Sequence, residues 1–249
     1  MDLIYTPKGA AREYAELALN IFKGCQFGCQ YCYGPGVMRT SRKNFSSGPM
    51  IKADFLERLE KDCRKLEGTD PPPVLISFVG DPYQLAPDPD LLNEPQEFWA
   101  ARDAIKMLMK YEIPFTVLTK GGMAAARDFD LIKEADASFG TSLVWTDDTS
   151  RQFWEPNAAS VKSRSRAIMT AKDMGITTWV SLEPVIDPDQ ALGVIDRMAM
   201  FVDHWKVGKI NHLSHIEKLV DWGKFREDVI QKLDEVNADY YIKKSLSEI

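Results

Sequence analysis

Three cysteines fall within eight residues near the amino terminus. Cys25, Cys29 and Cys32 follow C-x3-C-x2-C spacing in the segment NIFKGCQFGCQYCY. Thiolates are soft ligands that suit iron–sulfur clusters, zinc and copper(I). Gly24 and Gly28 give this loop the backbone freedom to bend all three sulfurs toward one centre. The spacing therefore predicts a metal-binding loop, and three thiolates leave one iron of a cluster without a protein ligand.

Zinc is the main alternative for such a loop. A structural zinc site usually takes four ligands arranged as two separated pairs. The chain has no second cysteine pair, and its three histidines lie in the last fifth of the sequence. The pattern therefore favours an iron–sulfur cluster over zinc or over three buried structural cysteines. The fourth cysteine, Cys63, falls in a predicted helix, where we expect a small buried apolar residue.

Composition limits the class of protein. A chain of 249 residues with 45% hydrophobic side chains can bury a substantial core, and we expect one domain over 1–249. The net charge of −6 argues against a broad duplex-binding surface, because phosphate neutralisation supplies most non-specific affinity. No secretory signal or membrane-spanning run is evident. We expect a cytoplasmic protein with no membrane partner.

Short β-rich apolar runs alternate with amphipathic stretches, as in consecutive βαβ units. Six units are too few for an eight-stranded barrel and too regular for a mixed α+β fold. We predict an α/β fold, namely a partial, open (β/α)6 TIM-type barrel, with a doubly wound sheet as the alternative. The helix and edge strand of residues 222–249 are expected to complete the barrel. The expected strands are Leu17–Phe22, Val74–Val79, Phe115–Thr119, Phe139–Val144, Thr177–Leu182, Trp205–Val207 and Tyr240–Ile242, and the expected helices are Ala53–Leu66, Gln96–Tyr111, Ala125–Ala135, Ala158–Met174, Pro188–Phe201 and Lys224–Val236.

Ligands gather at the carboxyl ends of parallel strands in either architecture. The cysteine loop, residues 24–34, follows the first predicted strand, and Asp81 follows the second. Lys120 ends the third strand. Strand alternation puts Ser181 and Glu183 on one face of the fifth. These strand ends are where we expect ligand contacts.

A polar stretch follows the fourth predicted strand. It carries three aromatic residues, Trp145, Phe153 and Trp154, and we expect it to be a loop. These rings can stack a base, cover a site or pack beneath the loop.

The cysteine spacing and the aromatic residue after it resemble the cluster motif of the radical S-adenosylmethionine (SAM) superfamily. Other segments resemble the branch of that superfamily that contains spore photoproduct lyase, and the resemblance covers most of the chain. These segments are Tyr31-Cys32-Tyr33, Asp81-Pro82-Tyr83-Gln84, Thr119-Lys120-Gly121, Arg127-Asp128 and Ser181-Leu182-Glu183-Pro184.

The resemblance implies a radical SAM enzyme of lyase or isomerase type. Cys25, Cys29 and Cys32 would hold three irons of a [4Fe–4S] cluster, and SAM would chelate the fourth. An external one-electron donor of the flavodoxin or ferredoxin type would drive cleavage of SAM to a 5′-deoxyadenosyl radical, which abstracts hydrogen from the substrate. The substrate is unidentified, with a nucleobase, a modified nucleotide or DNA among the candidates. The alternative is a non-catalytic iron–sulfur or zinc module that binds a nucleic acid or protein partner.

The resemblance also implies a set of SAM contacts. Asp81 is expected at the SAM amino group and Lys120 at the carboxylate. Glu183 is expected to bind the ribose or to orient substrate, unless it forms a structural ion pair with Lys206 or Lys209. The full expected set is Tyr31, Tyr33, Asp81, Lys120, Ser142, Ser181 and Glu183.

One departure from the spore photoproduct lyase pattern concerns the second strand. That enzyme repairs a thymine dimer in DNA and uses a cysteine there as hydrogen donor to a substrate radical. The run from Val74 to Gly80 contains no cysteine. Little of the chain is left to extract a base from a duplex. We therefore expect shared cofactor chemistry without that repair reaction.

Overall fold

An open, mostly parallel sheet organises the computed structural model, which describes residues 2–85, 95–211 and 213–249. Within that part of the chain the strand order is β1-β2-β5-β6-β7-β8-β9-β10. Strand β1 is antiparallel to β2, and every other neighbouring pair is parallel. The bounds are β1 Ile4–Tyr5, β2 Leu17–Leu19, β5 Val74–Ile76, β6 Phe115–Thr119, β7 Ser138–Ser142, β8 Thr177–Val185, β9 His204–Lys209 and β10 Asp239–Ile242.

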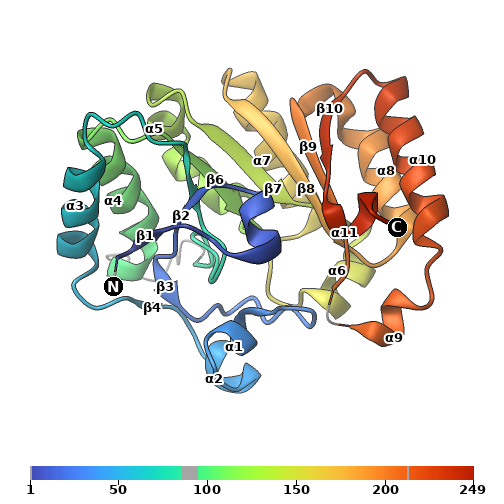
Figure 1. Ribbon diagram of the computed structural model, residues 1–249, viewed down its shortest axis with the longest axis horizontal. Helices are drawn as coiled ribbons and strands as arrows, with labels where there is room; N and C mark the ends of the chain where they lie inside the picture. The colour runs from blue at the N-terminus through green and yellow to red at the C-terminus, as the bar shows by residue number, and fades with distance from the viewer. Residues whose placement is uncertain (1, 86–94, 212) are drawn as a thin grey trace.

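Six strand–helix units follow one another along the chain. Figure 1 shows their helices around the outside of the curved sheet, from α3 and α4 at the left to α8 and α10 at the right. They are α3 Phe55–Leu66, α4 Gln96–Lys110, α5 Phe129–Glu134 after the 3-10 helix η2 Gly122–Asp128, α7 Val161–Asp173, α8 Pro188–Met198 with η3 Ala199–Phe201, and α10 Trp222–Glu235.

The strand order separates the two predicted architectures. A doubly wound sheet reverses its strand order at a switch point. Here the spatial order follows the chain order without reversal, and β1 and β10 are separate edges of the described sheet. The predicted α/β fold with a partial, open barrel is therefore confirmed.

Shorter elements gather at the carboxyl ends of the strands. Figure 1 shows α1, α2, α6 and α9 along the lower edge of the molecule, and the 3-10 helix η1 in front of the sheet. A separate two-stranded ribbon pairs β3 with β4. The bounds are η1 Gly9–Glu13, β3 Phe22–Lys23, α1 Gly34–Val37, α2 Arg42–Phe45, β4 Met50–Ile51, α6 Asp148–Trp154, α9 Ser214–Glu217 and α11 Lys244–Ser247.

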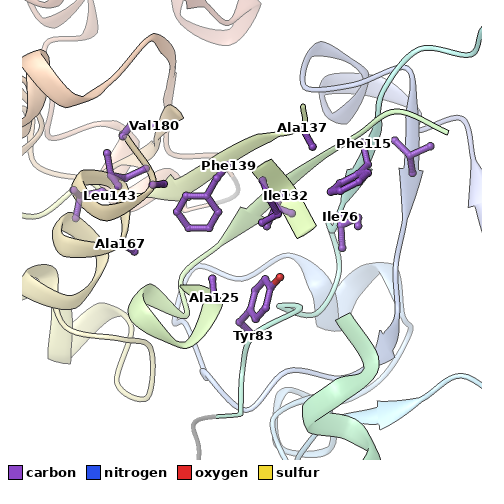
Figure 2. Packing of buried hydrophobic residues seen from close by; sticks show 14 of the residues in the cluster. Ile76, Tyr83, Phe115, Ala125, Ile132, Ala137, Phe139, Leu143, Ala167 and Val180 are labelled. Atoms are coloured by element: carbon purple, nitrogen blue, oxygen red, sulfur yellow. The ribbon is translucent and has the colours of Figure 1, made fainter. Parts of the chain in front are cut away.

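The main core lies between the sheet and the outer helices. The rings of Phe129 and Phe139 meet edge to face, with centroids 4.8 Å apart. Cys63 of α3 is fully buried in this core, which confirms the expectation of a small apolar residue. A second, smaller cluster around Trp179 lies apart from it. Figure 2 shows core side chains from the sheet, Ile76, Phe115, Phe139 and Val180, and from the helical layer, Ala125, Ile132 and Ala167.

Two predicted strands are shorter than expected for one shared reason. The predicted strand Leu17–Phe22 is divided, because β2 ends at Leu19 and Phe22 belongs to the separate ribbon. Between them the Asn20 side chain accepts hydrogen bonds from the backbone N–H groups of Phe78 and Val79, at 2.9 and 2.8 Å. These side-chain bonds replace sheet pairing on both segments. The second strand consequently ends at residue 76 instead of 79.

The polar stretch after the fourth strand is also different from the prediction. We expected a loop here, but the chain forms the helix α6. Asp147 caps this helix by accepting a hydrogen bond from the Ser150 N–H at 2.9 Å. None of the helices in the described residues has the length and apolar character needed to cross a membrane.

Candidate functional site

The cysteine loop packs backbone against backbone. The N–H of Cys25 donates to the Phe45 carbonyl at 2.8 Å. Gly24 has a φ of +96°, and a Cβ there would lie 2.8 Å from that same carbonyl oxygen. Gly80, with a φ of +81°, approaches the loop in the same way, since its Cβ would lie 2.7 Å from the Gly24 oxygen. Only glycine fits at these two positions, so the loop is held against α2 and the segment after β5.

The three cysteines are free thiols. Cys29 is buried, and Cys25 and Cys32 are half-buried. Burial, reinforced by the Asp81 charge, raises the pKa of Cys25 to about 12. Burial likewise raises the pKa of Cys29. Without a bound cation these two groups stay protonated at neutral pH, so binding of a metal centre must release their protons.

The donor set fits a cluster better than a single ion. In the described residues no three His, Cys, Asp or Glu side chains converge as ligands of one metal ion. The three thiolates of an iron–sulfur cluster bind different irons, so they surround the cluster at greater distances from one another than the ligands of a single ion. The Cys32 sulfur accepts a hydrogen bond from the Gly34 N–H at 3.3 Å, which suits a thiolate ligand. Arg42 donates to the Cys29 and Cys32 carbonyls at 2.7 and 3.4 Å and so holds the loop from its other side.

A buried ion pair joins the cysteine loop to α7. The Tyr31 hydroxyl donates to Glu155, which pairs with Arg164, and both charged side chains are 0% exposed. Arg164 also donates to the carbonyls of Ser142 and Ala159, at 3.0 and 2.9 Å. This group fixes Tyr31 against the end of β7.

Charge compensation keeps Glu155 ionised. Burial alone would raise its pKa, but the charges of Arg164 and Lys120 and the Tyr31 hydrogen bond bring it below its usual value. The Lys120 ammonium lies 5.8 Å from the centre of the Tyr31 ring. The structure therefore brings together two predicted residues, Tyr31 and Lys120, and adds Glu155 and Arg164.

Asp81 joins the segment after β5 to the end of β6. Its carboxylate accepts from the Thr119 hydroxyl at 2.6 Å, the Lys120 N–H at 2.7 Å and the Tyr83 N–H at 2.9 Å. Burial raises the pKa of Asp81, although these hydrogen bonds oppose that effect. The carboxylate thus holds the Lys120 backbone in place beside the cysteine loop.

A row of polar side chains crosses the inner face of the sheet, opposite the outer helices. Ser142 pairs with Ser181, Ser181 with Lys206, and Lys206 with Tyr241 in successive strand registers. Residues paired across parallel neighbouring strands point to the same face. Tyr14, at the end of η1, covers the row, with its hydroxyl 2.7 Å from the Ser181 hydroxyl. The structure therefore places the predicted residues Ser142 and Ser181 side by side.

Glu183 forms a second ion pair, and its partner is neither Lys206 nor Lys209. Lys243 lies 2.9 Å from both Glu183 carboxylate oxygens. The Tyr14 hydroxyl also donates to this carboxylate. Gly208 makes room for the pair, since a Cβ there would lie 2.8 Å from Glu183 and 3.0 Å from Lys243.

The alternative that Glu183 pairs with Lys206 or Lys209 is therefore wrong. The Lys206 ammonium donates to the Tyr14 carbonyl at 2.7 Å, and Lys209 lies 3.8 Å from Glu217. Lys243 comes from the segment after β10, which runs beside β9. The pairing of β10 with β9 thus brings Lys243, which is among the last eight residues of the chain, to Glu183.

Aromatic rings line the inner face beside this pair. The Tyr14 ring lies 6.0 Å from Phe78 and 6.2 Å from Trp179. Gly140 leaves space for the indole, because a Cβ there would meet it at 2.2 Å. Tyr33 donates to the Phe78 carbonyl at 3.0 Å and is 45% exposed. Tyr33 is therefore the most exposed ring of this group.

Comparison with known proteins places the chain among radical SAM proteins. Residues 19–202 match the Radical SAM superfamily. An uncharacterized protein of Methanocaldococcus jannaschii is 24% identical over 176 residues, which cover 70% of this chain and 62% of that protein. The chain thus spans less than two thirds of this curated relative.

Solved structures share the fold at low identity. A spore photoproduct lyase variant with bound AdoMet and dinucleoside spore photoproduct superposes with a TM-score of 0.71 at 11% identity, covering 96% of this chain and 78% of that one. Streptococcus suis SuiB bound to S-adenosylmethionine gives 0.68 at 11% identity, covering 93% and 52%. SuiB bound to the precursor peptide SuiA gives 0.66 at 12% identity, covering 91% and 48%. The chain therefore spans about half the length of SuiB.

Proposed function

Because the chain belongs to the radical SAM superfamily, we propose that it is an enzyme that reductively cleaves SAM and abstracts hydrogen from its substrate. The observation that best supports this proposal is a loop of three free thiols beside the carboxyl edge of an open parallel barrel. The thiols belong to Cys25, Cys29 and Cys32. These thiols would hold a [4Fe–4S] cluster. When bound, the cluster supplies the electron that cleaves the sulfonium of SAM, yielding the 5′-deoxyadenosyl radical.

The residues around the loop would grip the methionine end of SAM. The Lys120 ammonium lies over the Tyr31 ring, and Asp81 accepts a hydrogen bond from the Lys120 backbone N–H. From this position the ammonium would pair with the SAM carboxylate. Asp81 would accept a hydrogen bond from the SAM amino group. Tyr31 and Tyr33 flank Cys32 and supply the aromatic surface.

The inner wall would bind the nucleoside end of SAM. Glu183 and Ser181 face the interior together, and a carboxylate can accept both ribose hydroxyls. Ser142, next to Ser181 in register, extends this polar row. Lys243, in the segment 222–249, pairs with Glu183 of this wall. Residues 1–249 would therefore form one domain that this segment completes.

A nucleotide or modified nucleobase is the substrate class that the inner face suits best. Lys206 forms no ion pair within the described residues and lies 5.5 Å from the Trp179 ring. Burial, followed by the Lys243 charge, lowers the pKa of Lys206, and an anionic group beside the ammonium would oppose this shift by stabilising its charged form. A cation next to aromatic rings suits a phosphate attached to a base. The cytoplasm, where flavodoxin- or ferredoxin-type donors are present, is the proposed compartment.

Anaerobic reconstitution tests the proposed activity. The protein is loaded with iron and sulfide, its electron paramagnetic resonance is recorded with and without SAM, and dithionite is added before 5′-deoxyadenosine is assayed. We expect a reduced-cluster signal that SAM perturbs, together with 5′-deoxyadenosine. A protein that holds zinc, or that neither binds nor cleaves SAM after verified loading, would support the non-catalytic binding module instead.

The substrate class has its own test. Binding of the dinucleotide pTpT to SAM-loaded protein is followed by tryptophan fluorescence, with an uncharged peptide of similar mass as the comparison. We expect saturable quenching by the dinucleotide alone and about tenfold weaker binding in Lys206→Met. Equal affinity of the variant and the parent protein contradicts the nucleotide assignment.

A further inference from the structure

Charge is distributed unevenly along the chain around the cysteine loop. The segment between Glu16 and Asp54 contains five basic residues and no acidic residue, although the whole chain has a net charge of −6. The five are Lys23, Arg39, Arg42, Lys43 and Lys52. An acidic protein thus carries one continuous basic segment, and that segment contains all three cluster cysteines.

The basic segment forms a projecting surface. Figure 1 shows α1 and α2 at the lower edge of the molecule, below the sheet. Arg39, Arg42 and Lys43 are exposed there. No acidic residue lies within residues 33–50 to offset these cations. The surface defined by residues 33–50 is therefore electropositive.

Apolar side chains stand among these cations. Val37 is 61% exposed and Met38 is 38% exposed, and both directly precede Arg39 in the chain. Exposed methionine and aliphatic groups mixed with arginine are typical of protein–protein contact surfaces. Phosphate recognition alone gives no reason to expose these apolar groups, so the composition favours a protein partner over a nucleic acid.

This surface is in direct contact with the cysteine loop. Arg42 donates to the carbonyls of Cys29 and Cys32, and the Gly34 N–H at the start of α1 donates to the Cys32 sulfur. A partner seated on α1 and α2 would therefore stand within a few residues of the cluster ligands. Electron transfer weakens steeply with distance, so a carrier seated on this face would be well placed to reduce the cluster.

We infer that the surface of residues 33–50 is the docking site for an acidic one-electron carrier protein of the flavodoxin type. This inference rests on the proposed radical SAM function. One electron leaves the reduced carrier, which is oxidised by one electron, and enters the oxidised cluster, which is reduced by one. Positive charge on this face steers the acidic carrier, and the apolar groups form the centre of the contact.

The test compares charge reversal on and off this surface. The double variant Arg39→Glu with Lys43→Glu leaves Arg42 and its contacts intact. Lys133→Glu is the matched control, because Lys133 is exposed on α5 just before β7 begins, at the opposite end of the sheet. Calorimetry measures the dissociation constant of each cluster-loaded protein for an oxidised acidic flavodoxin at low salt, and cleavage of SAM is assayed with reduced flavodoxin and with dithionite.

We expect the double variant to bind flavodoxin at least about tenfold more weakly and to lose flavodoxin-driven cleavage while it keeps dithionite-driven cleavage. The Lys133→Glu control should retain flavodoxin binding, flavodoxin-driven cleavage and dithionite-driven cleavage. Unchanged flavodoxin affinity in the double variant, or no binding by the parent protein, overturns the inference. Binding of a single-stranded oligonucleotide is measured for the same proteins. If the double variant loses oligonucleotide binding but keeps flavodoxin binding, the surface binds nucleic acid and the inference is also overturned. Failure of dithionite-driven cleavage in the parent protein refutes the proposed function separately.

Discussion

Two groups in this molecule have similar composition but different surroundings. In each, a tyrosine hydroxyl donates to a glutamate that pairs with a basic side chain. Tyr31, Glu155 and Arg164 join the cysteine loop to α7, and the two charged side chains are 0% exposed. On the inner face, Tyr14 and Glu183 meet Lys243, with the glutamate 14% and the lysine 4% exposed.

The difference separates a positioning role from a binding role. Arg164 also donates to two backbone carbonyls of the chain itself, so both charges of the closed group are occupied within the fold. The open group faces the barrel interior, beside Ser181 and Lys206. We expect changes in the closed group to act on stability and loop geometry, and changes in the open group to act on ligand affinity.

The largest effect is expected at the cysteines that the closed group holds in place. Cys29→Ala should lose the cluster and reduce SAM cleavage to background, because a cluster ligand is removed. Cys63→Ala should keep both, since Cys63 lies in the outer core. Iron content and 5′-deoxyadenosine yield measure the outcome. Full cleavage in Cys29→Ala would refute the ligand assignment.

The closed group should dominate stability. Arg164→Met leaves the Glu155 carboxylate buried without its cation, and breaking such a pair costs about 3–5 kcal/mol. Urea unfolding of the cluster-free protein measures this loss. Arg164→Met combined with Glu155→Gln should recover much of it, because no unpaired charge remains. An unstable double variant and a stable single one would show that the pair does not act as a unit.

The open group should change SAM affinity more than stability. Glu183→Gln keeps the shape of the side chain but removes the charge that faces the interior, and we expect about tenfold weaker SAM binding, or about 1.4 kcal/mol. Glu217→Gln, which affects only the more distant contact with Lys209, is the matched control. Equilibrium dialysis with labelled SAM compares the three proteins. If Glu183→Gln bound SAM with unchanged affinity, the open group would have no role in SAM binding.

The smallest expected effect concerns pH. The lowered pKa of Glu155 means that its ionised form stabilises the fold at every pH above the unfolded carboxyl value of about 4.3. That contribution disappears as the pH falls through the lower folded-state pKa. The free energy of unfolding of the parent protein relative to Glu155→Gln should therefore be flat near neutrality and shrink in acid. A difference that grows on acidification would reverse the assigned sign.

Local patterns predicted the fold well. Strand β6 matches its predicted range, and the helices α4 and α3 begin or end within two residues of expectation. Prediction failed where a side chain replaced backbone pairing, as Asn20 does for Phe78 and Val79. It also missed α6, whose cap at Asp147 lay within a stretch that we interpreted by polarity alone.

The sequence by itself determined the cysteine spacing, the alternation of strands and helices, and the basic segment between Glu16 and Asp54, because each is a property of neighbouring residues. Only the tertiary structure decided which charges meet. Tyr14 reaches Ser181 across 167 residues, and Glu183 reaches Lys243 across 60. Such pairings depend on strand register, since a shift of one residue turns every side chain of a strand to the other face.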